Sequence, residues 1–239
     1  AHGLRKCSMR KLALFVWVAA LLMQSCRLGS VQHSFAHAPR AGPNSEAQDA
    51  SGVIFLESIA LYTTRLGVSK DQAYALYKEH GTALRGLLAQ GLLDAAGAER
   101  YLQEVHDIDY SDIQEDAALD AILGRLKCDW PVWIFTASTA EHAQRCLQRL
   151  GLNSLRLSGI VDTRACKLET KHSPGSFEVA MAAAGGVKPH RCVLCDDSPK
   201  NVHAAKLAGW QTVLVGFHSR ETGEKVVCKE ADYHIGSLH

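Results

Sequence analysis

The feature that most constrains this chain is a change of hydrophobic period near residue 130. Up to there, apolar residues recur at helical spacing, and helices are predicted at 53–66, 70–80, 82–93, 95–105 and 116–126. Beyond it, strands predicted at 131–135, 158–161, 192–194, 212–215 and 233–235 alternate with helices at 139–150, 176–184 and 199–207. Such alternation predicts a parallel sheet covered by helices on both faces. We expect an α/β, Rossmann-like core behind an N-terminal helical block.

Size and charge exclude several classes of protein. The 239 residues provide for one domain, or one domain with a small insertion. A net charge of +1 creates no overall field for nucleic acid or an acidic membrane, so neither is an expected partner. The eight cysteines do not form a disulfide scaffold in a chain this long. Cys192 and Cys195 lie in a predicted buried strand, which favours buried thiols over a zinc or redox site.

The N-terminal segment differs from the rest of the chain. Basic residues at positions 5, 6, 10 and 11 precede an uncharged apolar run at 12–23, which is too short to span a bilayer comfortably. This is the signal-peptide pattern, and residues 33–39, within an Ala-, Ser-, Gly- and Pro-rich stretch at 30–51, resemble the start of a plastid transit peptide. The alternatives are a hydrophobic helix and an artefact of the deduced sequence, which would leave the protein cytoplasmic. We therefore predict a leader or disordered segment at 1–50 and no stable membrane span.

Polar residues follow three of the predicted strands, where ligands of open α/β sheets bind. The hydroxyl of Thr136, with the amides of Ala137 and Ser138, can bind a phosphate oxygen, although the segment can instead be a helix N-cap, with Ser138 or Thr139 as the capping residue. Lys171 can neutralise a phosphoryl group, although a surface lysine would look the same. We expect a small-molecule phosphate as the ligand.

Two adjacent carboxylates, Asp196 and Asp197, follow the predicted strand at 192–194. Adjacent carboxylates repel each other, so a bound divalent cation explains them better than helix capping, which needs only one. Oxygen ligands of this kind suit Mg²⁺, which we predict as the cofactor.

The order hydroxyl, lysine and double aspartate resembles the haloacid dehalogenase superfamily of phosphohydrolases over residues 54–235. In the family's terms, residues 134–136 look like motif II, Lys171 like motif III and residues 194–197 like motif IV. The resemblance implies that Thr136 and Lys171 are catalytic and bind the phosphate with Ala137, and that Asp196 and Asp197 bind Mg²⁺. It also implies a helical cap at 51–127 and a core at 128–239.

The helical block resembles the cap of pyrimidine 5'-nucleotidases of the fungal and plant type. The similarity lies in residues 73–87, and residues 105–110 and 197–201 fit the same group. It implies a nucleoside monophosphate substrate, UMP or CMP, with Thr82 as a substrate-binding residue. Tyr77 and His106 are further candidates to face the nucleoside, and their alternative role is packing.

One part of the family pattern is missing. Members begin with a strand ending in Asp-x-Asp, in which the first Asp attacks phosphorus and the second is the general acid and base. Here only Asp49 precedes Asp71, without an apolar strand before it, and Glu57 fits a helix better. Either another segment, such as 12–18, fills the central slot, or the first exon is wrong, which we favour. The prediction is an impaired nucleotidase, with a non-catalytic phosphate- or nucleotide-binding protein or a structural domain as alternatives. The oligomeric state stays open.

Overall fold

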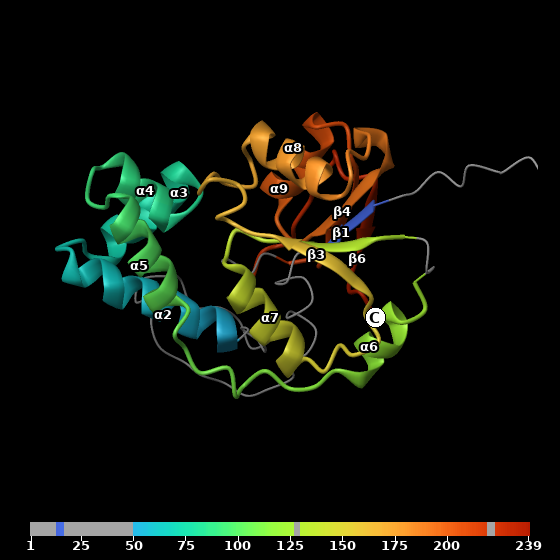
Figure 1. Ribbon diagram of the computed structural model, residues 1–239, viewed down its shortest axis with the longest axis horizontal. Coiled ribbons are helices and arrows are strands. Elements are labelled where there is room, and N and C mark those ends of the chain that lie inside the picture. Colours follow the sequence, from blue (N-terminus) through green and yellow to red (C-terminus); the bar gives the residue numbers. More distant parts are fainter. Residues whose placement is uncertain (1–12, 17–49, 127–129, 219–222) are drawn as a thin grey trace, which may run out of the picture.

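The computed structural model describes residues 13–16, 50–126, 130–218 and 223–239. Within them, the α/β part contains a six-stranded parallel sheet with the strand order β3-β2-β1-β4-β5-β6 (Figure 1). The strands are β1 (Ala13–Val16), β2 (Val132–Phe135), β3 (Leu157–Val161), β4 (Cys192–Asp196), β5 (Gln211–Val215) and β6 (Tyr233–Ile235). The predicted α/β, Rossmann-like fold is confirmed.

The central strand β1 comes from the segment that the sequence analysis assigned to a leader. Leu14 pairs with Val132 of β2 on one side and with Val193 of β4 on the other. Ala13 and Phe15 are fully buried, as befits a short uncharged segment between two layers of helices. The expectation that the core lacks its first strand is therefore wrong. The alternative, in which residues 12–18 fill the central position of the sheet, describes the structure for Ala13–Val16. The remaining leader residues, 1–12 and 17–49, lie outside the described part of the chain.

Helices cover both faces of the sheet, as Figure 1 shows. On one face, Phe15 packs in a cluster with Phe177 of α8 (Pro174–Ala183) and Ala205 of α9 (Pro199–Leu207). On the other face, the neighbouring residue Leu14 packs with side chains of α6 (Ala117–Leu123) and α7 (Ala140–Arg149). A short 3-10 helix, η1 (Pro189–Arg191), leads into β4. Alternate residues of β1 thus contribute to the two cores.

The helical block consists of α2 (Ala50–Arg65), α3 (Lys70–His80), α4 (Ala83–Ala89) and α5 (Ala95–Val105), which share a separate core. The predicted start of α3 is present as a capping box, in which the Ser69 side chain accepts from Gln72 and Gln72 accepts from Ser69. The predicted helix at 116–126, which corresponds to α6, was expected to belong to this block. Leu119 and Leu123 of α6 instead pack with the sheet, so the structural block ends near Val105.

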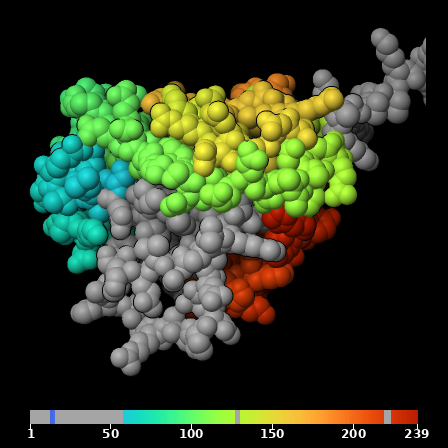
Figure 2. Space-filling view, turned by 90° about the horizontal axis from the view of Figure 1, so that it is seen from below, coloured from blue at the N-terminus to red at the C-terminus, as the bar shows by residue number. Residues whose placement is uncertain are grey.

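The block and the sheet lie side by side, with the block at one end of the molecule and the C-terminal segment at the other (Figures 1 and 2). Among the described helices, none combines the length and the apolar character that crossing a membrane requires.

Candidate functional site

Thr136 lies directly after β2 with 2% of its surface exposed. Its amide donates to the Val161 carbonyl (2.9 Å), which ties the loop to β3. Its hydroxyl oxygen accepts the Ser138 amide (3.0 Å). The Ser138 amide, which we expected to face a phosphate, thus bonds within the loop, while Ala137 lies half-buried between the two residues.

Lys171 is buried at the same edge of the sheet. Its Nζ donates to Asp196 Oδ2 (2.6 Å) and to the carbonyl oxygen of Phe135 (3.3 Å). Burial lowers the pKa of this ammonium group, and the charge of Asp196 opposes that shift. With 4% of the residue exposed, Lys171 is not a solvated surface lysine. It joins the end of β2 to the end of β4.

Asp196 is fully enclosed, whereas Asp197 is half-buried. Besides Lys171, Asp196 binds the Ser198 amide and the Asn201 side-chain amide, both at 2.9 Å from Oδ1. These contacts fix the start of α9 beneath the carboxylate. The structure thus brings Thr136, Ala137, Lys171 and the two aspartates together at one edge of the sheet.

The same carboxylates are the candidate ligands for a divalent cation. The described residues contain no group of three or more His, Cys, Asp and Glu side chains placed to hold a metal ion. Mg²⁺, however, usually keeps several waters and binds one or two carboxylates together with phosphate oxygens. Asp197, with Asp196 behind it, fits such a partial set, and a ligand phosphate would have to complete it.

No carboxylate directly follows β1 in the sequence. Val16 pairs with Ile134 and Cys195, one residue short of the ends of β2 and β4. The chain then continues Trp17-Val18-Ala19, and its first acidic residue is Glu46. The strand slot is filled, but the acidic pair that the resemblance requires behind it is absent.

The turn between α3 and α4 lies against the segment that carries Lys171. A methyl group at Gly81 would lie 3.0 Å from Thr170 Cγ2 and 3.1 Å from His172 Nδ1. Thr82 is thereby placed near the site, but its hydroxyl caps α4 by accepting the Arg85 amide (3.1 Å). Tyr77, by contrast, lies on α3 with 39% of its surface exposed.

His106 makes a second contact between the helical block and the site. Its Nε2 lies 2.7 Å from Ser138 Oγ, and its Nδ1 lies 2.6 Å from the Leu102 carbonyl oxygen. His106 is 6% exposed. From the sequence, His106 was a candidate to contact the nucleoside, and Ser138 was expected to bind a phosphate oxygen through its amide only. The spacing of 32 residues gave no local signal for this pair.

A branched ion pair adds a third contact, which sequence analysis also missed. Arg164 donates to both carboxylate oxygens of Glu99 on α5, at 2.7 and 3.1 Å, and to Glu141 on α7 at 2.9 Å. Bidentate pairing of this kind fixes orientation as well as distance.

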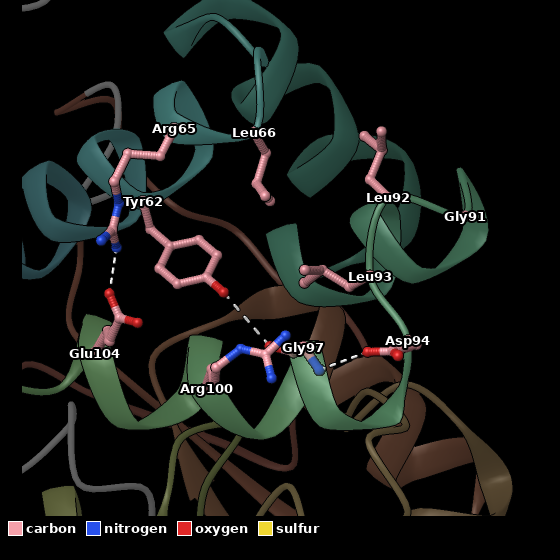
Figure 3. Close-up of a pocket in the computed structure, with 10 residues that line it drawn as sticks. All are labelled: Tyr62, Arg65, Leu66, Gly91, Leu92, Leu93, Asp94, Gly97, Arg100 and Glu104. Carbon is pink, nitrogen blue, oxygen red and sulfur yellow. Dashed lines mark hydrogen bonds and ion pairs between the residues drawn. The ribbon is translucent and has the colours of Figure 1, made fainter.

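The helical block also holds a cavity of about 520 Å³ between α2 and α5 (Figure 3). Tyr62 points into it and donates to the Gly97 carbonyl (3.5 Å), and Arg65 pairs with Glu104 at its rim. None of its lining residues belongs to the predicted site.

Comparison with known proteins gives both a family and a fold. The model of the haloacid dehalogenase-like hydrolases matches residues 26–209. Among solved structures, β-phosphoglucomutase from Clostridium difficile matches with a TM-score of 0.59 and 15% identity, over 95% of this chain and 92% of that chain. An L-2-haloacid dehalogenase matches with a TM-score of 0.52 and 14% identity, over 95% and 96%.

A third structure, CbbY from Rhodobacter sphaeroides in complex with xylulose-(1,5)-bisphosphate, has a TM-score of 0.55 and 16% identity. It covers 79% of this chain and 89% of its own. At these identities the structural matches establish the fold alone.

Proposed function

This chain belongs to the haloacid dehalogenase-like hydrolases, and from that premise we propose that it binds a phosphate monoester where β2 and β4 end. We further propose that it does not react through an aspartyl-phosphate. The observation that carries the proposal is the position of Lys171 Nζ, which contacts both Asp196 and the carbonyl that precedes Thr136. A cation fixed between two strand ends is the group that a phosphate needs there.

Charge balance supports a role for Mg²⁺ in this binding. Lys171 pairs with Asp196, and the charge of Asp197 also acts on this ammonium group, so two carboxylates and an incoming phosphate would share one lysine. Two like charges repel strongly where water is scarce. Asp196 and Asp197 would hold Mg²⁺, whose positive charge would offset this repulsion. The two carboxylates, Asp196 and Asp197, thus favour dependence on Mg²⁺, which is a general property of the superfamily.

The proposed ligand is a pyrimidine nucleoside monophosphate, such as CMP or UMP. The support is the resemblance of residues 73–87 to nucleotidase caps, together with the contact of Gly81 with Thr170 and His172. The helical block then acts as a cap, whose α3–α4 turn lies over the segment that carries Lys171. The Thr82 side chain would reach a ligand only by giving up its bond to the Arg85 amide.

The proposed lack of aspartyl-phosphate chemistry follows from the residues behind β1. Trp17, Val18 and Ala19 carry neither a nucleophilic carboxylate nor a general acid. The phosphate would be held by Lys171 and the loop at Thr136 without the covalent step that the family's first aspartate performs.

Isothermal titration of the full chain with CMP and Mg²⁺ tests binding. We expect saturable binding that inorganic phosphate displaces and that a chelator weakens. Lys171→Met should abolish it, whereas Lys206→Met, a change at a partly exposed ion pair, should leave it unchanged. Thermal unfolding of both variants separates lost binding from lost folding.

Phosphate release from CMP and trapping with acid test the chemical part of the proposal. Binding by the wild-type chain that neither phosphate nor a chelator affects would refute the assignment of the site. An acid-stable peptide containing a phosphorylated aspartate would refute the claim that this route is absent.

A further inference from the structure

We propose that Ser138 and His106 form a nucleophile and general-base pair beside the phosphate site. Its substrate class is the phosphate monoester of the proposed function, on which this inference rests. The pair spans the helical block and the sheet, since His106 follows α5 and Ser138 lies in the loop between β2 and α7. Nothing in the family resemblance assigns a role to the hydroxyl of Ser138.

The hydrogen bonds fix which nitrogen of His106 acts as the base. Nδ1 lies 2.6 Å from a carbonyl oxygen, that of Leu102, which can only accept, so Nδ1 carries the proton. Nε2 is then the acceptor, and the Ser138 hydroxyl at 2.7 Å donates to it. Activated serine nucleophiles show this arrangement, in which a third group orients the base.

The surroundings keep His106 in the form that accepts a proton. Burial lowers its pKa, and the guanidinium charges of Arg164 and Arg145 lower it further. The bond to Leu102 and the charge of Glu141 oppose the shift. The ring of His142 packs beside it, with centroids 4.8 Å apart. A neutral imidazole at pH 7 follows from this balance.

Two hydrogen bonds hold the backbone of Ser138 in place, and part of the residue's surface stays exposed. Its amide donates to Thr136 Oγ1 (3.0 Å), and its carbonyl accepts the Thr163 amide (3.0 Å). The residue is half-buried, whereas His106 is almost enclosed. The nucleophile is therefore the less buried member of the pair, and it lies two residues from Thr136.

The reaction balances with water as the only second reactant. The Ser138 oxygen attacks phosphorus while its proton passes to His106 Nε2. The ester P–O bond breaks, and the leaving alkoxide takes that proton. Water then attacks the phosphoserine with His106 again as base, the Ser138 oxygen leaves and regains a proton, and inorganic phosphate forms.

A fluorophosphonate reagent tests the pair without requiring the phosphate site. Attack by Ser138 forms the Oγ–P bond and expels fluoride, and His106 takes the proton. We expect peptide mass spectrometry to find the adduct on Ser138. His106→Gln keeps a hydrogen-bonding side chain but no base, and should slow labelling about a hundredfold or more. The controls are His203→Gln and Ser111→Ala, at exposed residues outside the loop, and thermal unfolding confirms that each variant folds.

A second experiment distinguishes this inference from the proposed function. Acid quenching during incubation with p-nitrophenyl phosphate should trap phosphoserine at position 138, and Ser138→Ala should lose it. Binding of CMP without labelling or trapped phosphate at Ser138 would overturn the pair and leave the proposed function standing. Labelling of Ser138 without CMP binding would overturn the proposed function. Labelling that His106→Gln leaves unchanged would overturn the role of the base.

Discussion

The buried ion pair between Lys171 and Asp196 gives the sharpest test of the site. Lys171→Met removes the positive partner and keeps the length of the side chain. Within the described residues, Asp196, with none of its surface exposed, would then keep the hydrogen bonds from the Ser198 amide and the Asn201 side chain. Breaking a buried pair in this way costs about 3–5 kcal/mol, because a charge is left without compensation.

That cost is a large part of the stability of an ordinary domain, which is roughly 5–15 kcal/mol. We expect the midpoint of urea unfolding to fall sharply, measured by the fluorescence of buried tryptophans such as Trp210. Mutating the partner separates charge from packing. Asp196→Asn keeps an oxygen for Ser198 and Asn201, so the double variant Lys171→Met with Asp196→Asn should recover about half of the loss or more.

A matched surface pair provides the control. Lys206 binds Asp232 with side chains that are 41% and 31% exposed, so Lys206→Met should cost less than about 1 kcal/mol. A loss for Lys171→Met as small as that of the control would refute the claim that the site pair is shielded from water. A double variant no more stable than the single one would refute the uncompensated charge as the cause.

Three further predictions concern the rest of the molecule. Gly159→Ala should destabilise the chain by about 1–3 kcal/mol in urea unfolding, because its Cβ would lie 2.4 Å from Trp133 Cζ3 on the neighbouring strand; an unchanged midpoint would contradict this packing. Arg164→Ala should lower the free energy of unfolding by about 1 kcal/mol or less, since the ion pair of Arg164 with Glu99 is partly exposed. It should nevertheless speed amide hydrogen exchange in α5, and exchange equal to that of the wild type would argue against the role of this ion pair in holding α5. Burial lowers the pKa of His106 in the folded chain, so just below pH 6.5 the unfolded chain binds more protons than the folded chain. The free energy of unfolding should therefore be highest above that pH and should decrease as the pH falls. His106→Gln should reduce this dependence in urea titrations between pH 5 and 7.

The sequence determined the class of fold because its hydrophobic periods carry it. Helical spacing before residue 130 and alternation after it located the described α-helices and strands from α2 onward, although not the short helix η1, and the cap of α3 was predicted from Ser69 and Gln72. Thr136 and Asp196 could be placed at one edge of the sheet for the same reason, whereas Lys171 lies well beyond the end of β3. Parallel strands bring their carboxyl ends to one edge whatever the length of chain between them.

Only the tertiary structure decided which segment fills the centre of the sheet. The apolar, uncharged run that contains Ala13–Val16 suits a targeting helix and a buried strand equally well, and the unpaired edges of β2 and β4 select the strand. Likewise, no local pattern joins His106 to Ser138, or Arg164 to Glu99. Such contacts depend on how the helical block lies against the sheet, which is set by packing between residues far apart in the chain and not by the period of any one segment.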